Sequence, residues 1–246
     1  MKKLVAYITT SFPSKEFTVD LALSLKESGV DTIELGIPFS DPVADGEVIE
    51  KANQKALQNG FKIKELFEVS KEIAPKIDTL WMGYFNPFYH KGLKLFIDEA
   101  RESQVSGFII PDLPFEEAQS YKPEIEKANL ALIDFIAPTD PRSRVEMITK
   151  DSKKFIYLVA YAGITGSKKQ EDLSEIIESI REFTSTPVYV GFGVNEQSAK
   201  EKAVGVDGVI VGSAFVKILL DETLSQTQKI EKVSSLAKII KSKINE

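Results

Sequence analysis

The chain has 246 residues, of which 43% are hydrophobic and 28% are charged, and its formal net charge is −6. This length is sufficient to bury the core of one or two domains, and the interspersed charges show no basic face of the kind that binds nucleic acid. The chain has no cysteine, and its one histidine is His90. Disulfides, thiolate nucleophiles, multi-histidine metal sites and histidine triads are therefore excluded. We expect the chemistry to come from carboxylates, Tyr, Lys, Ser or Thr, with no metal site.

The sequence carries no signal for a membrane or for export. No apolar run is long enough to cross a bilayer, and the basic start Met1-Lys2-Lys3 leads directly into a strand-like run without a cleavage site. We therefore expect a cytoplasmic protein.

Short apolar, β-branched runs alternate with amphipathic stretches along the whole chain. The predicted strands are residues 4–9, 32–35, 79–83, 107–111, 131–136, 155–160, 188–191 and 208–211. The predicted helices are residues 17–28, 47–59 with 63–74, 93–103, 115–128, 142–149, 173–183, 196–203 and 228–244. Eight strands, each followed by a helix, predict an α/β fold of the (β/α)8 TIM barrel type, with a doubly wound open sheet as the main rival. No linker divides the chain, so we expect a single domain over residues 1–246.

A carboxylate ends the second predicted strand. Side chains alternate between faces along a strand, which makes Glu34 the last inward residue if Ile33 and Leu35 face the other layer. Burial at a barrel mouth raises a carboxyl pKa toward neutrality, where a general acid or base works best. The alternative for Glu34 is an ion pair inside the barrel. Asp45 follows on a Pro/Gly-rich loop, where the local sequence favours a helix N-cap.

Other polar residues follow the predicted strands, and the reactive groups of such barrels lie at the C-terminal ends of the strands. Near one mouth we expect Glu34, Asn86, Asp112, Asp134, Tyr157 and Tyr161. Tyr157 is equally consistent with a core tyrosine. Prolines on both sides of Asp112 favour a rigid turn, and His90 is expected in a loop.

Glycine-containing turns follow the last three predicted strands. They are residues 162–167, which include Gly166, then Gly191-Phe192-Gly193, and then Gly212-Ser213, after which residues 216–219 resemble a short extra helix. Backbone N–H groups in such turns and at a helix start can hold a phosphate. Each turn alone is best explained as a tight βα connection, but three in consecutive loops favour a phosphate site.

The stretch from Glu34 to Gly46, Glu-Leu-Gly-Ile-Pro-Phe-Ser-Asp-Pro-Val-Ala-Asp-Gly, resembles the signature of the tryptophan synthase alpha chain family. The resemblance continues at residues 157–166, 191–193 and 212–214 and spans nearly the whole chain. It implies a (β/α)8 barrel that cleaves indole-3-glycerol phosphate to indole and glyceraldehyde 3-phosphate in tryptophan biosynthesis. It also implies no cofactor in this chain and a beta-chain partner that carries pyridoxal phosphate, in an α2β2 heterotetramer.

The resemblance also implies roles for individual residues. Glu34 and Asp45 match the two catalytic carboxylates of the family, so Asp45 is expected to do more than cap a helix. Tyr157 matches an active-site tyrosine. The positions that match phosphate-binding residues are Gly166, Gly193, Gly212 and Ser213, and those that match walls of the indole pocket are Tyr7, Phe192 and Ile210.

The chain departs from the family pattern at a few positions. Tyr161 stands where some relatives have arginine, the first strand starts close to Met1, and Glu47 and Glu50 add negative charge beside Asp45. In a complex, we expect loops 38–46, 111–117 and 162–170 to gate the site and touch the beta chain. Two other functions remain open: a lyase that works alone and releases free indole, and a non-catalytic module that binds a phosphosugar.

Overall fold

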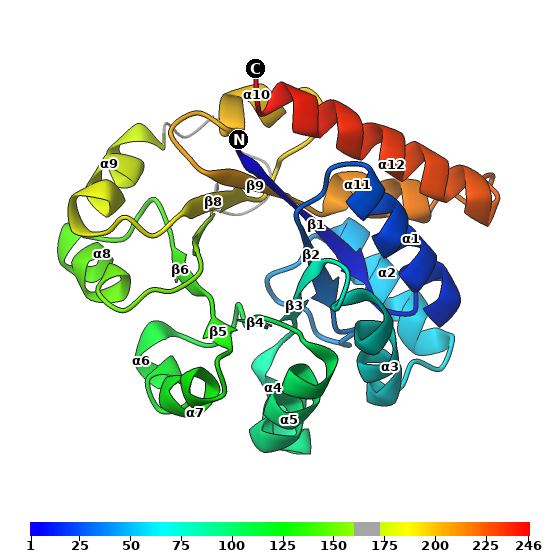
Figure 1. Cartoon of the computed structure of the whole chain (residues 1–246), viewed down its shortest axis with the longest axis horizontal. Helices are drawn as coiled ribbons and strands as arrows, with labels where there is room; N and C mark the ends of the chain where they lie inside the picture. The colour runs from blue at the N-terminus through cyan, green and yellow to red at the C-terminus, as the bar shows by residue number, and fades with distance from the viewer. Residues whose placement is uncertain (160–172) are drawn as a thin grey trace.

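A computed structural model describes residues 1–159 and 173–246 of the chain. Within these residues it has nine strands in one parallel sheet, with the order β5-β4-β3-β2-β1-β9-β8-β7-β6. Helices follow the strands around the outside (Figure 1). The sheet curls into a barrel, which confirms the predicted (β/α)8 fold and removes the open-sheet alternative.

The strand bounds agree closely with the prediction. The strands are β1 Lys3–Thr9, β2 Thr32–Gly36, β3 Asp78–Met82, β4 Gly107–Ile109, β5 Ala131–Leu132, β6 Asp134–Ile136, β7 Ile156–Val159, β8 Val188–Gly191 and β9 Gly208–Val211. The one difference in number comes from the fifth predicted strand, which divides into β5 and β6 around Ile133. β5 pairs with β4 and β6 pairs with β7. The two edge strands of the sheet, β5 and β6, are therefore consecutive in the chain and separated only by Ile133. This short connection, rather than hydrogen bonds between the two edge strands, closes the barrel.

The helices in chain order are α1 Lys15–Glu27, α2 Glu47–Gln58, α3 Ile63–Ile73, α4 Phe85–Lys91, α5 Leu93–Ser103, α6 Phe115–Ala118, α7 Lys122–Lys127, α8 Arg142–Thr149, α9 Ser174–Phe183, α10 Ala199–Lys202, α11 Ser213–Leu219 and α12 Gln226–Lys243. Two predictions were wrong. His90 lies in the last turn of α4 rather than in a loop, and the helix predicted over residues 115–128 is two short helices, α6 and α7.

Packing of aromatic rings explains why α4 forms. Proline is tolerated in a first helical turn, so Pro87 does not prevent it. Phe88 is fully buried, and its ring centroid lies 4.4 Å from that of Phe96 and 5.5 Å from that of Phe108. Burial of a large aromatic side chain contributes roughly 2 kcal/mol, which stabilises a helix too short to form alone.

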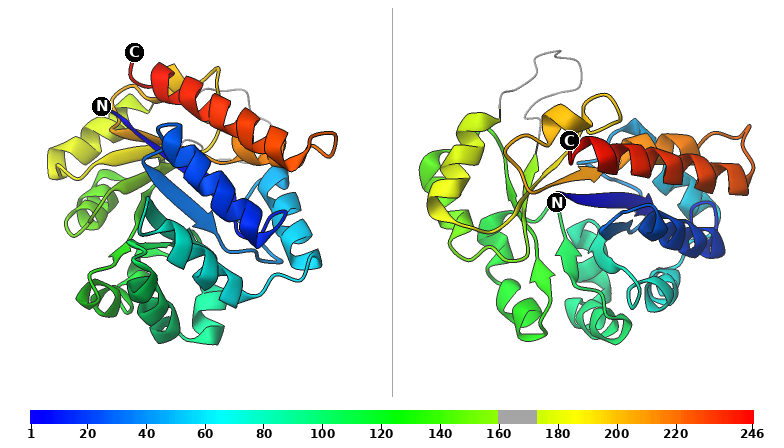
Figure 2. Two further views of the ribbon diagram at one scale, coloured as in Figure 1. Left: turned by 45° about the vertical axis from the view of Figure 1, so that its right-hand side comes forward. Right: turned by 45° about the horizontal axis from the view of Figure 1, so that its top comes forward.

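The outer helices surround the barrel strands (Figure 2), and the buried hydrophobic residues of strands and helices form one core cluster. Trp81 on β3 is fully buried there, and its indole N–H donates a 2.7 Å hydrogen bond to Ser70 on α3. The last helix, α12, lies beside α1, and the hydroxyls of Ser24 and Ser234 are 2.8 Å apart across this contact. The helix predicted over residues 228–244 is thus present as α12, which packs on the outside of the barrel.

The two chain termini meet at one end of the molecule (Figure 1). The backbone N–H of Lys2 donates to the side chain of Asn245 at 2.8 Å. Asp31, at the start of the β2 segment, pairs with both Lys3 and Lys241. These contacts fasten the last helix to the first strand. Among the residues that the structure describes, no helix has the length and apolar content needed to cross a membrane.

Candidate active site

Nine of the ten predicted site residues line one cavity of about 540 Å³. They are Glu34, Asp45, Tyr157, Tyr7, Phe192, Ile210, Gly193, Gly212 and Ser213. The tenth, Gly166, lies outside the described residues, as do the rest of the 162–167 turn and Tyr161. The cavity lies where β1, β2, β7 and β9 end, so the rule that a barrel carries its site at the C-terminal ends of its strands holds here.

Glu34 lies inside the barrel with 3% of its surface exposed. One of its carboxylate oxygens, Oε2, is buried and has no hydrogen-bond partner among the described residues. The alternative of an interior ion pair finds no support there. Burial raises the pKa of Glu34 to about 8, with a smaller contribution from the charge of Asp45. At neutral pH the Glu34 carboxyl is therefore mostly protonated and can donate a proton.

Asp45 lies on the loop before α2 but does not cap that helix. The N-cap position belongs to Gly46, and no side chain caps it. The Asp45 carboxylate instead accepts hydrogen bonds from the Tyr84 hydroxyl and, at 3.4 Å, from the side-chain amide of Asn53. Burial raises the pKa of Asp45 to about 6, against the effect of these two hydrogen bonds, which favour the charged form. At neutral pH the Asp45 carboxylate is therefore mostly ionised.

Tyr84 and Asn53 hold the Asp45 loop, and the sequence reasoning missed both. Tyr84 is 1% exposed, and its hydroxyl oxygen accepts a hydrogen bond from the backbone N–H of Ala44 at 3.1 Å. The same hydroxyl donates a hydrogen bond to the Asp45 carboxylate. The Tyr84 ring stacks on Phe39 with ring centroids 5.4 Å apart. Only the position of Tyr84 directly after a predicted strand could have indicated this role.

Two tyrosines reach into the cavity because a glycine faces each of them. A Cβ at Gly36 would lie 2.4 Å from the Tyr7 hydroxyl, and a Cβ at Gly191 would lie 2.3 Å from the Tyr157 ring. Any larger residue would displace these rings. Burial raises the pKa of both Tyr7 and Tyr157, so both remain protonated and neutral around the carboxylates.

Phe192 adopts a backbone conformation that bulky residues rarely use. Its φ is 69° and that of the following Gly193 is 70°, in the left-handed region that costs a residue with a Cβ about 1 kcal/mol. The ring of Phe192 meets that of Tyr157 edge to face at 6.1 Å. The turn thus places an aromatic wall over the cavity and brings the backbone of Gly193 to its edge. The short extra helix predicted after the last strand is confirmed as α11, which follows β9 and begins directly after Gly212.

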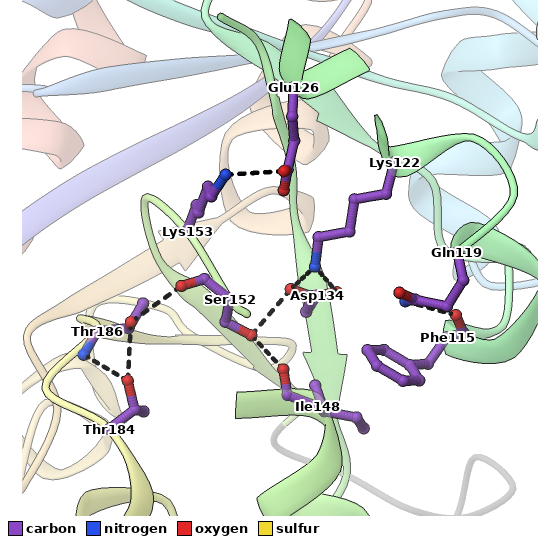
Figure 3. A network of polar contacts seen from close by, with 10 residues as sticks. All are labelled: Phe115, Gln119, Lys122, Glu126, Asp134, Ile148, Ser152, Lys153, Thr184 and Thr186. Carbon is purple, nitrogen blue, oxygen red and sulfur yellow. Dashed lines mark hydrogen bonds and ion pairs between the residues drawn. The ribbon is translucent and has the colours of Figure 1, made fainter. Parts of the chain in front are cut away.

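Three residues expected near the mouth do not line this cavity. Asn86 is exposed, and Asp112 accepts the backbone N–H of Phe85 at 2.8 Å, where it satisfies the start of α4. Asp134 is buried in an ion pair with Lys122, at 3.0 Å, and lies 2.8 Å from the Ser152 hydroxyl (Figure 3). This pair lies beside the break between β5 and β6 and joins α7 to the barrel.

The geometry therefore offers one carboxylic acid and one carboxylate in the same cavity at neutral pH. Carboxyl groups whose environments separate their pKa values can divide acid and anionic roles between them. Gly193, Gly212 and Ser213 line the same cavity as the two carboxyl groups.

Comparison with known proteins assigns the chain to a family. The family model for the tryptophan synthase alpha chain matches residues 1–245. The chain belongs to the tryptophan synthase alpha chain family. A tryptophan synthase alpha chain from Wolinella succinogenes is 58% identical over 246 residues, which cover the whole of this chain and 96% of that protein.

Solved structures agree with this assignment to the tryptophan synthase alpha chain family. The alpha subunit from Campylobacter jejuni superposes with a TM-score of 0.86 at 35% identity, covering 96% of this chain and 95% of that one. A structure of the tryptophan synthase α2β2 complex from Pyrococcus furiosus gives a TM-score of 0.85 at 32% identity, with coverage of 98% and 99%. The resemblance inferred from the sequence is thereby confirmed.

Proposed function

We propose that this chain cleaves indole-3-glycerol phosphate to indole and glyceraldehyde 3-phosphate, the alpha reaction of tryptophan biosynthesis. The observation that carries the proposal is the pair of carboxyl groups in one cavity, Glu34 with a pKa of about 8 and Asp45 with a pKa of about 6. The reaction needs one group that gives a proton and one that stays anionic.

The first step is proton transfer to the indole ring. Indole is a poor carbanion leaving group, so its C3 atom must be protonated before the carbon–carbon bond can break. Glu34 donates this proton, and the ring becomes a cation with its charge centred at the ring N–H. Asp45 accepts a hydrogen bond from that N–H and stabilises the charge, in a cavity where burial strengthens the interaction.

The second step breaks the carbon–carbon bond. The ionised Glu34 takes the proton from the hydroxyl on the carbon next to the ring, and that carbon becomes the aldehyde of glyceraldehyde 3-phosphate. The bond electrons return to the ring and restore aromatic indole. Glu34 ends the cycle protonated, so the proton balance closes on one residue and no redox partner is required. Tyr157 lines the same cavity and forms part of the wall around the reacting atoms.

The remaining cavity residues orient the substrate. Gly193, Gly212 and Ser213 bind the phosphate through backbone N–H groups and the serine hydroxyl, together with Gly166 outside the described residues. Tyr7, Phe192 and Ile210 form the walls around the indole ring. Holding both ends of the substrate places its C3 atom against Glu34, and such orientation contributes several kcal/mol to catalysis.

A beta chain is the proposed partner, in an α2β2 heterotetramer. The support is family membership and the structural match to the alpha chain of the Pyrococcus furiosus complex. The alpha reaction proceeds by proton transfer alone, so this chain takes no cofactor, and pyridoxal phosphate belongs to the beta chain. Loops 38–46, 111–117 and 162–170 are the proposed contacts. The role in tryptophan biosynthesis favours a cytoplasmic location.

The test is indole release from indole-3-glycerol phosphate, measured with and without an added beta chain. We expect indole from the wild-type chain in both cases and a faster rate with the beta chain. Full turnover by the chain alone would favour a lyase that works independently. Binding of glyceraldehyde 3-phosphate without any indole formation would refute the lyase and leave a phosphosugar-binding module.

A further inference from the structure

Lys217 lines the cavity but has no described partner. It lies on α11, is exposed, and forms no hydrogen bond or ion pair with any residue in the described ranges 1–159 and 173–246. Other lysines of the chain are paired, for example Lys3 with Asp31 and Lys243 with Glu196. A lysine that lines a cavity and has no ion-pair partner among the described residues is available to bind a ligand anion.

The position of Lys217 on α11 directs it toward the glycine turn. Lys217 follows Ser213 by four residues, and residues four apart lie on the same face of a helix. The Cα–Cβ bonds of a helix also tilt toward its N-terminus. The Lys217 side chain therefore leans back over Ser213, and all three of Gly212, Ser213 and Lys217 line the same cavity.

Among the described residues that line the cavity, Lys217 is the one cation. The carboxyl side chains that line it among the described residues are Asp45 and Glu196, together with Glu34, which is mostly protonated at neutral pH. The net charge of the chain is −6. A phosphate monoester that carries two negative charges is repelled by this surrounding potential unless a cation offsets it. Backbone N–H groups supply partial charges, whereas Lys217 supplies a full one.

We propose that Lys217 binds the phosphate of the substrate, as the side-chain cation at the outer edge of the cavity. This inference rests on the proposed function, because it assigns a cation to the phosphate end of the same substrate. Lys217 acts on capture and retention of the phosphate and not on the proton transfers at Glu34. Its loss therefore changes affinity for phosphorylated ligands and leaves the chemical step and the indole end unaffected.

The experiment compares the K217Q, K217R and K238Q variants with the wild type. Lys238 is the matched control, because it is an exposed lysine on α12 that does not line the cavity. The first readout is calorimetric binding of glycerol 3-phosphate, with glycerol and indole as controls, at about 20 and about 200 mM salt. The second is kcat and KM for indole-3-glycerol phosphate.

We expect the Kd for glycerol 3-phosphate to rise about tenfold in K217Q, which is the size expected for loss of a charge-assisted contact at a solvated edge. In K217R, which keeps the charge, the Kd should stay within about threefold of the wild-type value. KM follows Kd, whereas kcat and indole binding stay within about twofold. The wild-type affinity weakens with salt and that of K217Q changes less. K238Q behaves as wild type.

Equal phosphate affinity in K217Q and the wild type would overturn the inference, as would the same loss in K238Q. Loss of indole binding together with phosphate binding would show a structural effect instead and would also overturn it. Failure of the proposed function is distinguishable. If the wild-type chain releases no indole, but K217Q still binds glycerol 3-phosphate about tenfold more weakly than the wild type, the lyase activity is absent and the anion site at Lys217 remains.

Discussion

Replacing Glu34 with glutamine is expected to stabilise the protein at high pH. In the unfolded chain the Glu34 carboxyl has its ordinary pKa of 4.5, whereas burial raises it to about 8 in the folded protein. Between these values the folded protein holds a proton that the unfolded chain has lost. The wild-type free energy of unfolding therefore falls as the pH rises through this interval.

The size of the effect follows from the width of the interval. Each pH unit across it costs about 1.4 kcal/mol, so the full loss approaches about 5 kcal/mol, of which about 4 kcal/mol falls between pH 5 and pH 8.5. This is a large part of the stability of a typical domain, roughly 5–15 kcal/mol. Glutamine has nearly the same shape and cannot ionise, so the E34Q variant escapes the loss.

The assay is urea unfolding of the wild type and E34Q at a series of pH values. Other groups that titrate, Asp45 among them, are present in both proteins and largely cancel in the difference. We expect the stability difference in favour of E34Q to increase by about 4 kcal/mol over this range and to level off above it. A difference that does not change with pH would refute the buried, protonated Glu34 on which the mechanism depends.

Three further predictions concern the neighbours of Glu34 and the buried ion pair. The D45N variant should release indole at least about a hundredfold more slowly, and an unchanged rate in the indole assay would contradict the role of Asp45. Loss of the Asp45 charge should also lower the Glu34 pKa below about 8, but this pKa should stay above its usual range because burial is the larger cause of the shift. The Y84F variant removes a hydrogen bond that favours ionised Asp45, so the acidic limb of its activity profile should move up by roughly one pH unit, and an unmoved limb would exclude Tyr84 as a positioning residue. The K122M variant leaves Asp134 charged and buried, which should cost about 3–5 kcal/mol in urea unfolding. The K122M/D134L double variant should recover much of the lost stability. A K122M variant as stable as the wild type would show that an unpaired, buried Asp134 does not destabilise the fold.

Where the sequence pattern was local, it predicted the structure well. The strands at residues 188–191 and 208–211 have the predicted bounds, because β-branched runs between turn residues leave few alternatives. The inward position of Glu34 followed from the alternation of side chains along one strand. The cavity then followed from the rule that places such strand ends at one mouth of a barrel.

Features that depend on distant contacts were missed. The break at Ile133 arises because β5 and β6 must pair with different neighbours to close the barrel, and no residue in the segment signals this. α4 is stabilised by rings from α5 and β4 rather than by its own sequence. Asp45 looked like a helix cap because its actual partners, Tyr84 and Asn53, lie elsewhere in the chain.

The most direct test of the mechanism is the pH profile of kcat/KM for indole release by the wild-type chain. Glu34 must be protonated to donate its proton, so activity should fall as the pH rises past about 8. Asp45 must be ionised to stabilise the ring cation, so activity should also fall as the pH drops below about 6. We predict a bell-shaped profile with limbs near these two values. A profile that still rises above the upper value, or one without an acidic limb, would contradict the division of roles between the two carboxyl groups.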